Sequence, residues 1–115
     1  MTDAKQGVLG IIMFAQNNQQ QCPTNFEQMA PYLTDPEVLT SLASNYDFTY
    51  RGSMADITNS AGTIVLKEKQ AWQTADGGWR KAYGFADGHA EIYGAPDGNF
   101  DNWENQRMIP PPSRQ

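Results

Sequence analysis

The sequence has little cysteine, histidine or positive charge. It contains 115 residues, with one cysteine, one histidine and eight lysines and arginines. The lone Cys22 cannot form an internal disulfide or a thiol redox pair, and with a single histidine it cannot complete a zinc site. The net charge is −5, and the scattered basic residues make no patch for nucleic acid. We therefore expect no nucleic-acid partner.

Long hydrophobic runs are also absent. Hydrophobic residues make up 39% of the chain, and no apolar run approaches the roughly 18 residues that a bilayer span needs. The apolar stretch 8–14 is too short for a secretion signal, and no small, cleavable site follows it. The sequence therefore predicts one domain with a modest core and no membrane span in the chain as given.

The first part of the chain has a helical pattern, predicted over residues 2–21. An apolar stripe follows helical spacing and widens to most of the circumference through neighbouring apolar residues. Such a width indicates deep burial, or contact with other molecules as well as with the chain's own domain. Cys22 and Pro23 end this helix, because the residue before proline avoids helical geometry. The stripe comprises Val8, Ile11, Ile12 and Ala15, and it is widened by Leu9, Met13 and Phe14.

Two short helices are predicted next, over 25–33 and 36–43. Thr24 and Glu27 have the spacing of a capping box at the start of the first. Asp35 followed by Pro36 is typical of an N-cap and first helical position at the start of the second. Their apolar faces would bury Phe26, Met29, Leu33, Val38, Leu39 and Leu42.

After these helices the period changes to that of strands, predicted within 45–94. Tyr46, Phe48 and Tyr50 alternate with polar residues, and 62–68 gives a second strand. Asp87-Gly88 indicates a two-residue hairpin between 79–86 and 90–93. The fold class is therefore α+β, with a long N-terminal helix packed on an antiparallel sheet of three to four strands. Residues 1–94 form the globular domain, and 95–115 form a polar loop and a proline-rich tail.

Three ordered stretches resemble a known family. They are Gln6-Gly7-Val8-Leu9-Gly10-Ile11-Ile12-Met13-Phe14-Ala15-Gln16-Asn17-Asn18, the run from Cys22 to Leu33, and Tyr83-Gly84-Phe85-Ala86-Asp87-Gly88-His89-Ala90-Glu91. They are similar to type IV pilin-like and type II secretion pseudopilin-like proteins, of the prepilin-type group with a histidine nine residues before Asp-Gly. The resemblance implies a pilin fold and a non-catalytic subunit of a filament or secretion pseudopilus. It would assemble with copies of itself through Val8, Leu9, Ile11, Ile12 and Ala15.

The sequence departs from this family in several places. Gly77 stands where the group has its histidine, and Cys22 has no partner cysteine. The family's membrane helix and peptidase cleavage site do not precede the matching segment. We expect either a trimmed pilin-like protein, exported to the periplasm, cell surface or medium, or a natural relative without that helix. Cys22 would be a plain free thiol, or alternatively a link between two subunits.

An oxygen-rich stretch near the end is a candidate calcium loop. Asp97, Asn99 and Asp101 alternate after a turn, and Glu104 could complete the shell. Type II secretion pseudopilins have a C-terminal calcium loop, so the resemblance favours this interpretation. The alternative is a solvated turn built on Asp and Asn side chains, with no cofactor.

Asp87 and His89 flank Gly88 and could act as a base with its orienting group. The alternative is that Asp87 and Gly88 form the turn and His89 opens the returning strand. No motif places a serine or cysteine nucleophile beside them, so we predict that the protein is not an enzyme.

Exposed aromatic and proline residues are the remaining candidates. Trp72 is predicted in a loop, where it could contact a protein partner, as could the tail residues Pro110, Pro111 and Pro112. The tryptophans and tyrosines could alternatively form a sugar-stacking platform, although aromatics in strands belong more often to the core. Two other functions stay open: an accessory subunit of a larger protein complex, and a carbohydrate- or calcium-binding module.

Overall fold

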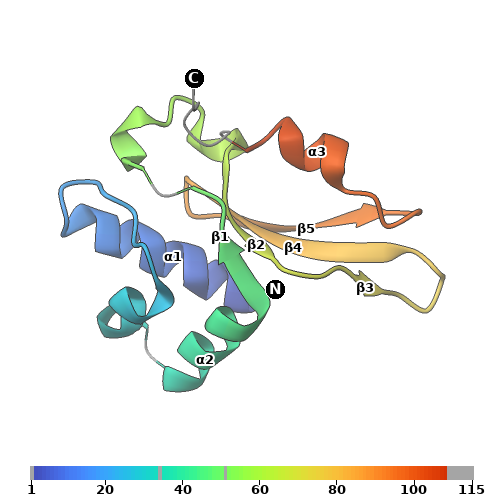
Figure 1. The fold of residues 1–115 in the computed structure, drawn as a ribbon, viewed down its shortest axis with the longest axis horizontal. Helices are drawn as coiled ribbons and strands as arrows, with labels where there is room; N and C mark the ends of the chain where they lie inside the picture. Colours follow the sequence, from blue (N-terminus) through green and yellow to red (C-terminus); the bar gives the residue numbers. More distant parts are fainter. Residues whose placement is uncertain (1, 34, 51, 109–115) are drawn as a thin grey trace.

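Three helical segments come before the first strand, as predicted, but two short 3₁₀ turns follow that strand and a further short helix, over 101–105, lies within the predicted loop and tail 95–115. The computed structural model describes residues 2–33, 35–50 and 52–108. The protein is α+β, with an N-terminal helix and a five-stranded antiparallel sheet (Figure 1). The helices are α1 (Thr2–Gln16), η1 (Phe26–Tyr32), α2 (Pro36–Asn45), η2 (Met54–Asp56), η3 (Ser60–Gly62) and α3 (Asp101–Asn105); the strands are β1 (Tyr46–Phe48), β2 (Ile64–Glu68), β3 (Trp72–Gln73), β4 (Trp79–Phe85) and β5 (Ala90–Ala95).

Strand β4 is the centre of the sheet. One of its edges pairs with β5 along its whole length, and the other edge pairs first with β3 and then with β2. Strand β1 extends the sheet beyond β2. The predicted sheet had three to four strands, and the additional strand is β3, which contains only Trp72 and Gln73. So short a strand carries no periodic pattern in the sequence.

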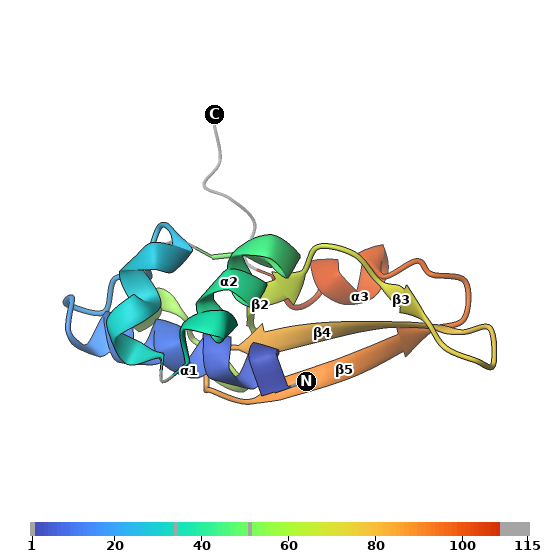
Figure 2. The same ribbon diagram turned by 90° about the horizontal axis from the view of Figure 1, so that it is seen from below.

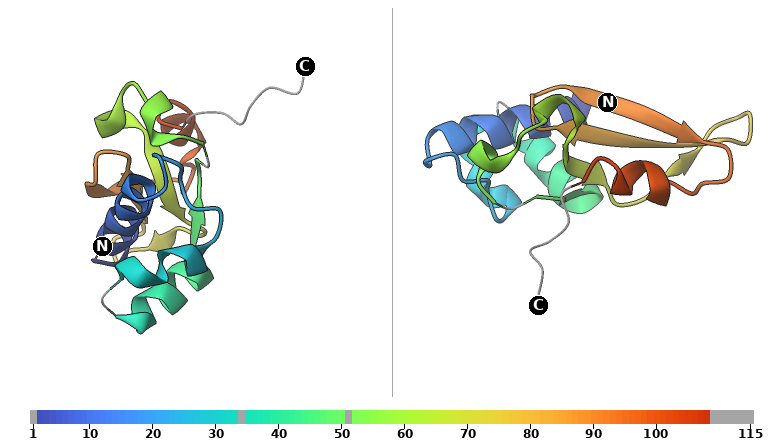
Figure 3. Two further views of the ribbon diagram at one scale, coloured as in Figure 1. Left: turned by 90° about the vertical axis from the view of Figure 1, so that its left-hand side faces the viewer. Right: turned by 90° about the horizontal axis from the view of Figure 1, so that it is seen from above.

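Helices cover both faces of this sheet. Alternate residues of β4 point to opposite sides, as in any strand. Ala82 and Ala86 join one core with α1 and Met29 of η1, whereas Tyr83 and Phe85 join a second core under α3. Figure 2 and Figure 3 show α1 and α3 on the two sides of the strands. None of the helices over 2–33, 35–50 and 52–108 has both the length and the apolar character that crossing a bilayer requires.

Glycines allow α1 to approach the sheet closely. A Cβ atom on Gly84 of β4 would lie 2.8 Å from Cβ of Val8, and a Cβ on Gly7 would lie 2.7 Å from Cδ2 of Leu66. Such distances are shorter than van der Waals contact, so a side chain at Gly84 would clash with a Cβ that cannot rotate away, and one at Gly7 would force the buried Leu66 and Leu42 side chains to shift. Gly7 lowers helix propensity, but it allows the helix backbone to sit directly over β2.

Helix α1 ends at Gln16, short of the predicted range 2–21. The side-chain amides of the next two asparagines donate to the carbonyls four residues earlier, at 3.0 and 2.8 Å. Gln19 and Gln20 then adopt left-handed φ values of 59° and 69°. The carbonyl of Gln20 accepts a bond from the Met54 backbone nitrogen at 2.6 Å. The amide-rich run therefore forms a turn held by a distant segment rather than the last turns of a helix.

The first short helix begins one residue later than predicted. Asn25 is the N-cap, and its side chain accepts from the Gln28 backbone nitrogen at 3.0 Å. The capping box is therefore made by Asn25 and Gln28 and not by Thr24 and Glu27. The element is a 3₁₀-helix with Pro31 inside it, and proline cannot donate the backbone bond that a continuing α-helix would need.

Candidate functional site

The apolar stripe of α1 is divided between the core and the surface. Val8, Ile11 and Ala15 are buried, with at most 1% of their surface exposed, and Val8 and Ile11 pack in one core with residues of β2 and β4. These three residues therefore belong to the core, which corrects the predicted assembly face. Leu9 keeps 39% of its surface exposed, and Ile12 is half-buried. Met13, which the predicted assembly face did not include, is also 39% exposed, so Leu9 and Met13 form an outer apolar pair one helical turn apart.

The β4–β5 turn lies against the edge of this outer face. A Cβ atom on Gly88 would lie 3.2 Å from Cδ1 of Ile12 and 3.5 Å from Cδ2 of Leu9. Lys5 Nζ donates to the carbonyl oxygen of Gly88 at 3.0 Å. Gly88 has a φ of +100°, which other residues adopt only with strain. The turn therefore needs glycine here for its backbone conformation, and glycine also leaves room for α1.

The turn itself contains three residues, not the predicted two. The backbone nitrogen of Phe85 donates to the carbonyl oxygen of His89, and that of Gly88 donates to the carbonyl oxygen of Phe85, both at 2.9 Å. The loop is thus Ala86-Asp87-Gly88, with its last residue left-handed. This is the arrangement of three-residue hairpins, in which a type I turn precedes a glycine.

His89 lies between two carboxylates at the start of the returning strand. Its Nδ1 lies 2.5 Å from Asp87 Oδ1, and its Nε2 lies 2.8 Å from Glu91 Oε2. Its ring stacks on Phe85, with centroids 4.3 Å apart. Burial lowers the pKa of His89, but the bonds to Asp87 and Glu91 outweigh it and raise the pKa above its usual value. The predicted Asp87–His89 pair is formed, with both ring nitrogens occupied by carboxylates.

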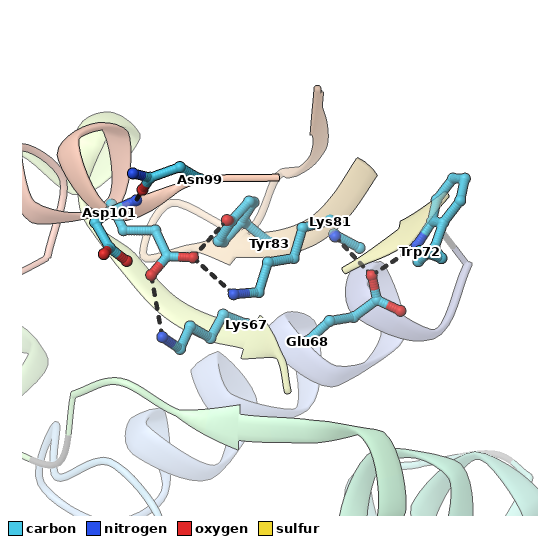
Figure 4. A network of polar contacts seen from close by, with 9 residues as sticks. Lys67, Glu68, Trp72, Lys81, Tyr83, Asn99 and Asp101 are labelled. Atoms are coloured by element: carbon cyan, nitrogen blue, oxygen red, sulfur yellow. Dashed lines mark hydrogen bonds and ion pairs between the residues drawn. The ribbon is translucent and has the colours of Figure 1, made fainter. Parts of the chain in front are cut away.

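Glu104 is the centre of an ion-pair network on the face of the sheet that α3 covers, and Figure 4 shows its partners Lys67, Lys81 and Tyr83. Its Oε1 lies 3.1 Å from Lys67 Nζ, and its Oε2 lies 2.9 Å from Lys81 Nζ. The hydroxyl of Tyr83 donates to the same Oε2 at 2.6 Å. Burial raises the pKa of Glu104, but these three bonds outweigh it and lower the pKa below its usual value. The network joins α3 to β2 and β4.

Three predicted calcium ligands, Asp97, Asn99 and Glu104, are engaged in other contacts, and Glu104 belongs to this ion-pair network. Asp97 Oδ1 and Asn99 Oδ1 each accept the backbone nitrogen two residues on, at 3.0 Å, so both cap turns. The carboxylate of Glu104 forms ion pairs with Lys67 and Lys81 instead of lining a vacant coordination shell. Over 2–33, 35–50 and 52–108, no group of three or more His, Cys, Asp or Glu side chains gathers to hold a metal ion. Calcium binding at Asp97, Asn99, Asp101 and Glu104 stays a prediction.

A second set of polar contacts involves Trp72, and the sequence did not predict it. Trp72 lies in strand β3 rather than in the predicted loop, and 41% of its surface is exposed. Its indole Nε1 donates to Glu68 Oε1 at 3.0 Å, and the backbone nitrogen of Ala82 donates to the same oxygen at 2.7 Å. The carboxylate of Glu68 therefore bridges the gap between β2 and β3 on the edge of β4. Pro110, Pro111 and Pro112 lie outside the described residues.

Sequence reasoning missed the lysines that surround Glu104. The available signal was the alternation of β4, which places Lys81 and Tyr83 on the same face. Nothing in the sequence connects that face to residue 104, because the contact depends on how α3 folds back over the sheet. Comparison with known proteins adds no assignment: no protein-family model, curated protein or solved structure matches the chain.

Proposed function

We propose that the protein is a non-catalytic, pilin-like structural subunit that assembles with copies of itself through the outer face of α1. The observation that carries this proposal is the exposure of Leu9 and Met13, each 39% exposed and one helical turn apart. Single exposed apolar side chains are common on protein surfaces and need no explanation. Here, however, two such residues adjoin the half-buried Ile12 on a helix whose opposite face holds the core.

One helix can therefore serve both the subunit and its neighbour. The inner side of α1, with Val8 and Ile11, stabilises the isolated domain. The outer pair would be covered by the next subunit, which removes apolar surface from water. This division supports the resemblance to pilin-like proteins, in which the first helix contacts both its own sheet and neighbouring subunits.

The arrangement of His89 supports a role without catalysis. A general base needs a free nitrogen within reach of a substrate proton. Both ring nitrogens of His89 are bonded to carboxylates of its own hairpin, Asp87 and Glu91. The histidine therefore supports the turn that lies beside the outer face of α1.

The experiment is photo-crosslinking in cells that produce the protein, with a benzophenone amino acid at position 13. We expect a ladder of bands at multiples of the subunit mass, because position 13 would face the next copy. The same probe at position 47 is the matched control, since Asp47 is exposed on β1 at the opposite edge of the sheet. The substitution Leu9→Glu should abolish the ladder while leaving the far-ultraviolet circular dichroism unchanged.

Other outcomes contradict the proposal. A ladder of equal strength from position 47 would mean that crosslinking reports crowding rather than the outer face of α1. A single crosslinked band containing a different protein would indicate an accessory subunit instead. Absence of any crosslink at position 13, in cells where the protein is folded, would show that this face is not an interface.

A further inference from the structure

We infer that the groove beside Trp72 binds a neutral sugar unit of a polysaccharide. The groove has a volume of about 340 Å³ and lies between the end of α2 and the segment that links β2 to β3. One wall is the exposed indole of Trp72, and the remainder is mostly polar. It is lined by Ser44, Asn45, Glu68, Lys69, Gln70, Ala71 and Trp72.

A hydrogen bond orients the indole before any ligand arrives. Its Nε1 donates to Glu68 Oε1, and the same oxygen is anchored by the backbone nitrogen of Ala82 on β4 (Figure 4). The Trp72 ring is thus held by the central strand although 41% of its surface is exposed. A fixed aromatic ring loses little conformational entropy on binding, so its stacking energy is retained. This arrangement favours a ligand that stacks on the ring face.

The other lining residues supply groups that can bond to hydroxyls. The side chains of Ser44, Asn45 and Gln70 carry both donors and acceptors, and Glu68 has a second carboxylate oxygen in addition to the one that holds Trp72. The backbone nitrogen of Lys69 donates to the carbonyl oxygen of Asn45 at 2.8 Å, which joins the two sides of the groove. A pyranose ring presents an apolar C–H face to an aromatic ring and hydroxyls at its rim, which matches these two walls.

The charge and polarity of the groove favour a neutral sugar over nucleic acids, acidic glycans and protein partners. The lining has one acidic residue, Glu68, and one basic residue, Lys69, so it offers no excess positive charge to nucleic acids or acidic glycans, and the net charge of the chain is −5. A protein interface would be expected to contain an apolar centre, but Trp72 and Ala71 are the apolar members of a lining that is otherwise polar. A neutral sugar satisfies both the ring and the hydrogen-bonding groups. The site is independent of the proposed assembly, because β3 pairs with the start of β4 and the turn beside α1 follows its end.

The test is titration of the folded protein with soluble neutral oligosaccharides, followed in nuclear magnetic resonance spectra by the backbone amide signals of Asn45 and Lys69 in the groove and, in the wild type, also by the indole N–H signal of Trp72. The probes are hexamers of β-linked glucose and of N-acetylglucosamine, together with galactose and mannose oligomers. We expect at least one probe to shift the Trp72 signal. Trp72→Ala should weaken binding about tenfold or more, and Trp72→Phe should retain part of it. Ile92→Ala, at a side chain also 41% exposed, should bind as the wild type does.

A second variant guards against loss of structure, since Trp72→Ala also removes the bond to Glu68. Ser44→Arg places a long side chain across the groove while leaving Trp72 in place, and it should abolish binding with the melting temperature retained. Binding that survives Ser44→Arg and Trp72→Ala would overturn the proposal. So would the absence of any shift with millimolar concentrations of all four probes, and so would binding of a protein partner that requires Trp72 while no glycan binds.

Discussion

Lys81 Nζ lies 2.9 Å from Oε2 of Glu104, and this contact fastens α3 to the sheet. The short helix has no side-chain cap at its start, so little in its own sequence stabilises it. Glu104 is instead held by Lys67, Lys81 and Tyr83 from two neighbouring strands. The aromatic ring of Trp103 packs beside this network, 4.7 Å from Tyr83 between centroids. The position of α3 therefore depends on the sheet more than on local helix propensity.

Replacing Glu104 should cost substantial stability. In Glu104→Ala, the ammonium groups of Lys67 and Lys81 lose their shared partner, and Lys81 keeps only 12% of its side chain exposed. Removing one partner of a buried ion pair typically destabilises a protein by about 3 kcal/mol. We expect a loss of that size in the free energy of unfolding from urea titration. Glu27→Gln is the control, because Glu27 is exposed, and it should change stability by less than about 0.5 kcal/mol. An equal effect of the two variants would contradict the role of the network.

The close contact between α1 and β4 gives a second prediction. In Gly84→Ala, the new methyl group would meet Cβ of Val8 at 2.8 Å. Both atoms are attached directly to backbone, so neither can rotate away, and overpacking of this kind costs about 1–3 kcal/mol. We expect a lower melting temperature by calorimetry. The control is Gly78→Ala, where the nearest atom is a carboxylate oxygen of the exposed Asp76 at 3.3 Å, which needs to give by only a few tenths of an ångström. A Gly84→Ala variant as stable as the wild type would show that α1 can shift outward freely.

The elements predicted correctly are those with local signals. The N-cap Asp35 accepts from the Glu37 backbone nitrogen at 2.9 Å, and Pro36 occupies the first turn, as expected for α2. Tyr46 and Phe48 of β1 are buried on either side of an exposed residue, which confirms the alternation there, whereas Tyr50 lies beyond the end of the strand. In each case the residues that determine the structure lie within a few positions of one another.

The errors arise where distant segments decide the outcome. The end of α1 depends on Met54, whose backbone nitrogen bonds to Gln20. Strand β3 exists because β4 offers an unpaired edge beyond β2, and Glu68 fills the gap between them. The oxygen-rich spacing of 97–104 is visible in sequence, but the two lysines that occupy Glu104 come from distant strands. Helical periodicity likewise identified an apolar stripe on α1 without showing which side faces the sheet.

Cys22 provides a prediction about reactivity. It is 5% exposed and belongs to the core, so the alternative of a link between subunits is not supported by its position. Burial raises the pKa of its thiol to about 11. Because the thiolate is the reactive form, we expect almost no reaction with Ellman's reagent at pH 8 in the native protein and rapid reaction in denaturant. Cys22→Ala with Asp47→Cys is the control, and its exposed thiol should react at once. Fast labelling of native wild type would show that this part of the core opens readily.

His89 gives a prediction about pH. Its pKa is raised by Asp87 and Glu91 despite partial burial, so the folded state binds the proton more tightly than the unfolded state does. The resulting stabilisation is fully present below the unfolded pKa of about 6.5 and is lost as pH rises through the higher folded-state pKa. The pKa of Asp87 is also affected: burial raises it, but bonds from His89 outweigh this and lower it. Asp87 therefore stays ionised well into the acidic range, losing its contribution only as pH falls through its lowered value.

The check is to compare the wild type with His89→Gln across pH. We expect the variant to be less stable than the wild type by about 1 kcal/mol or less at pH 5, because the side chains are a third exposed and solvent screens the pair. That difference should shrink steadily above pH 7.

A nuclear magnetic resonance titration should place the pKa of His89 above 6.5. A lower value, or a difference that is the same at pH 5 and pH 9, would mean that the two carboxylates do not hold the charged imidazolium. The histidine would then support the hairpin through its stacking on Phe85 alone.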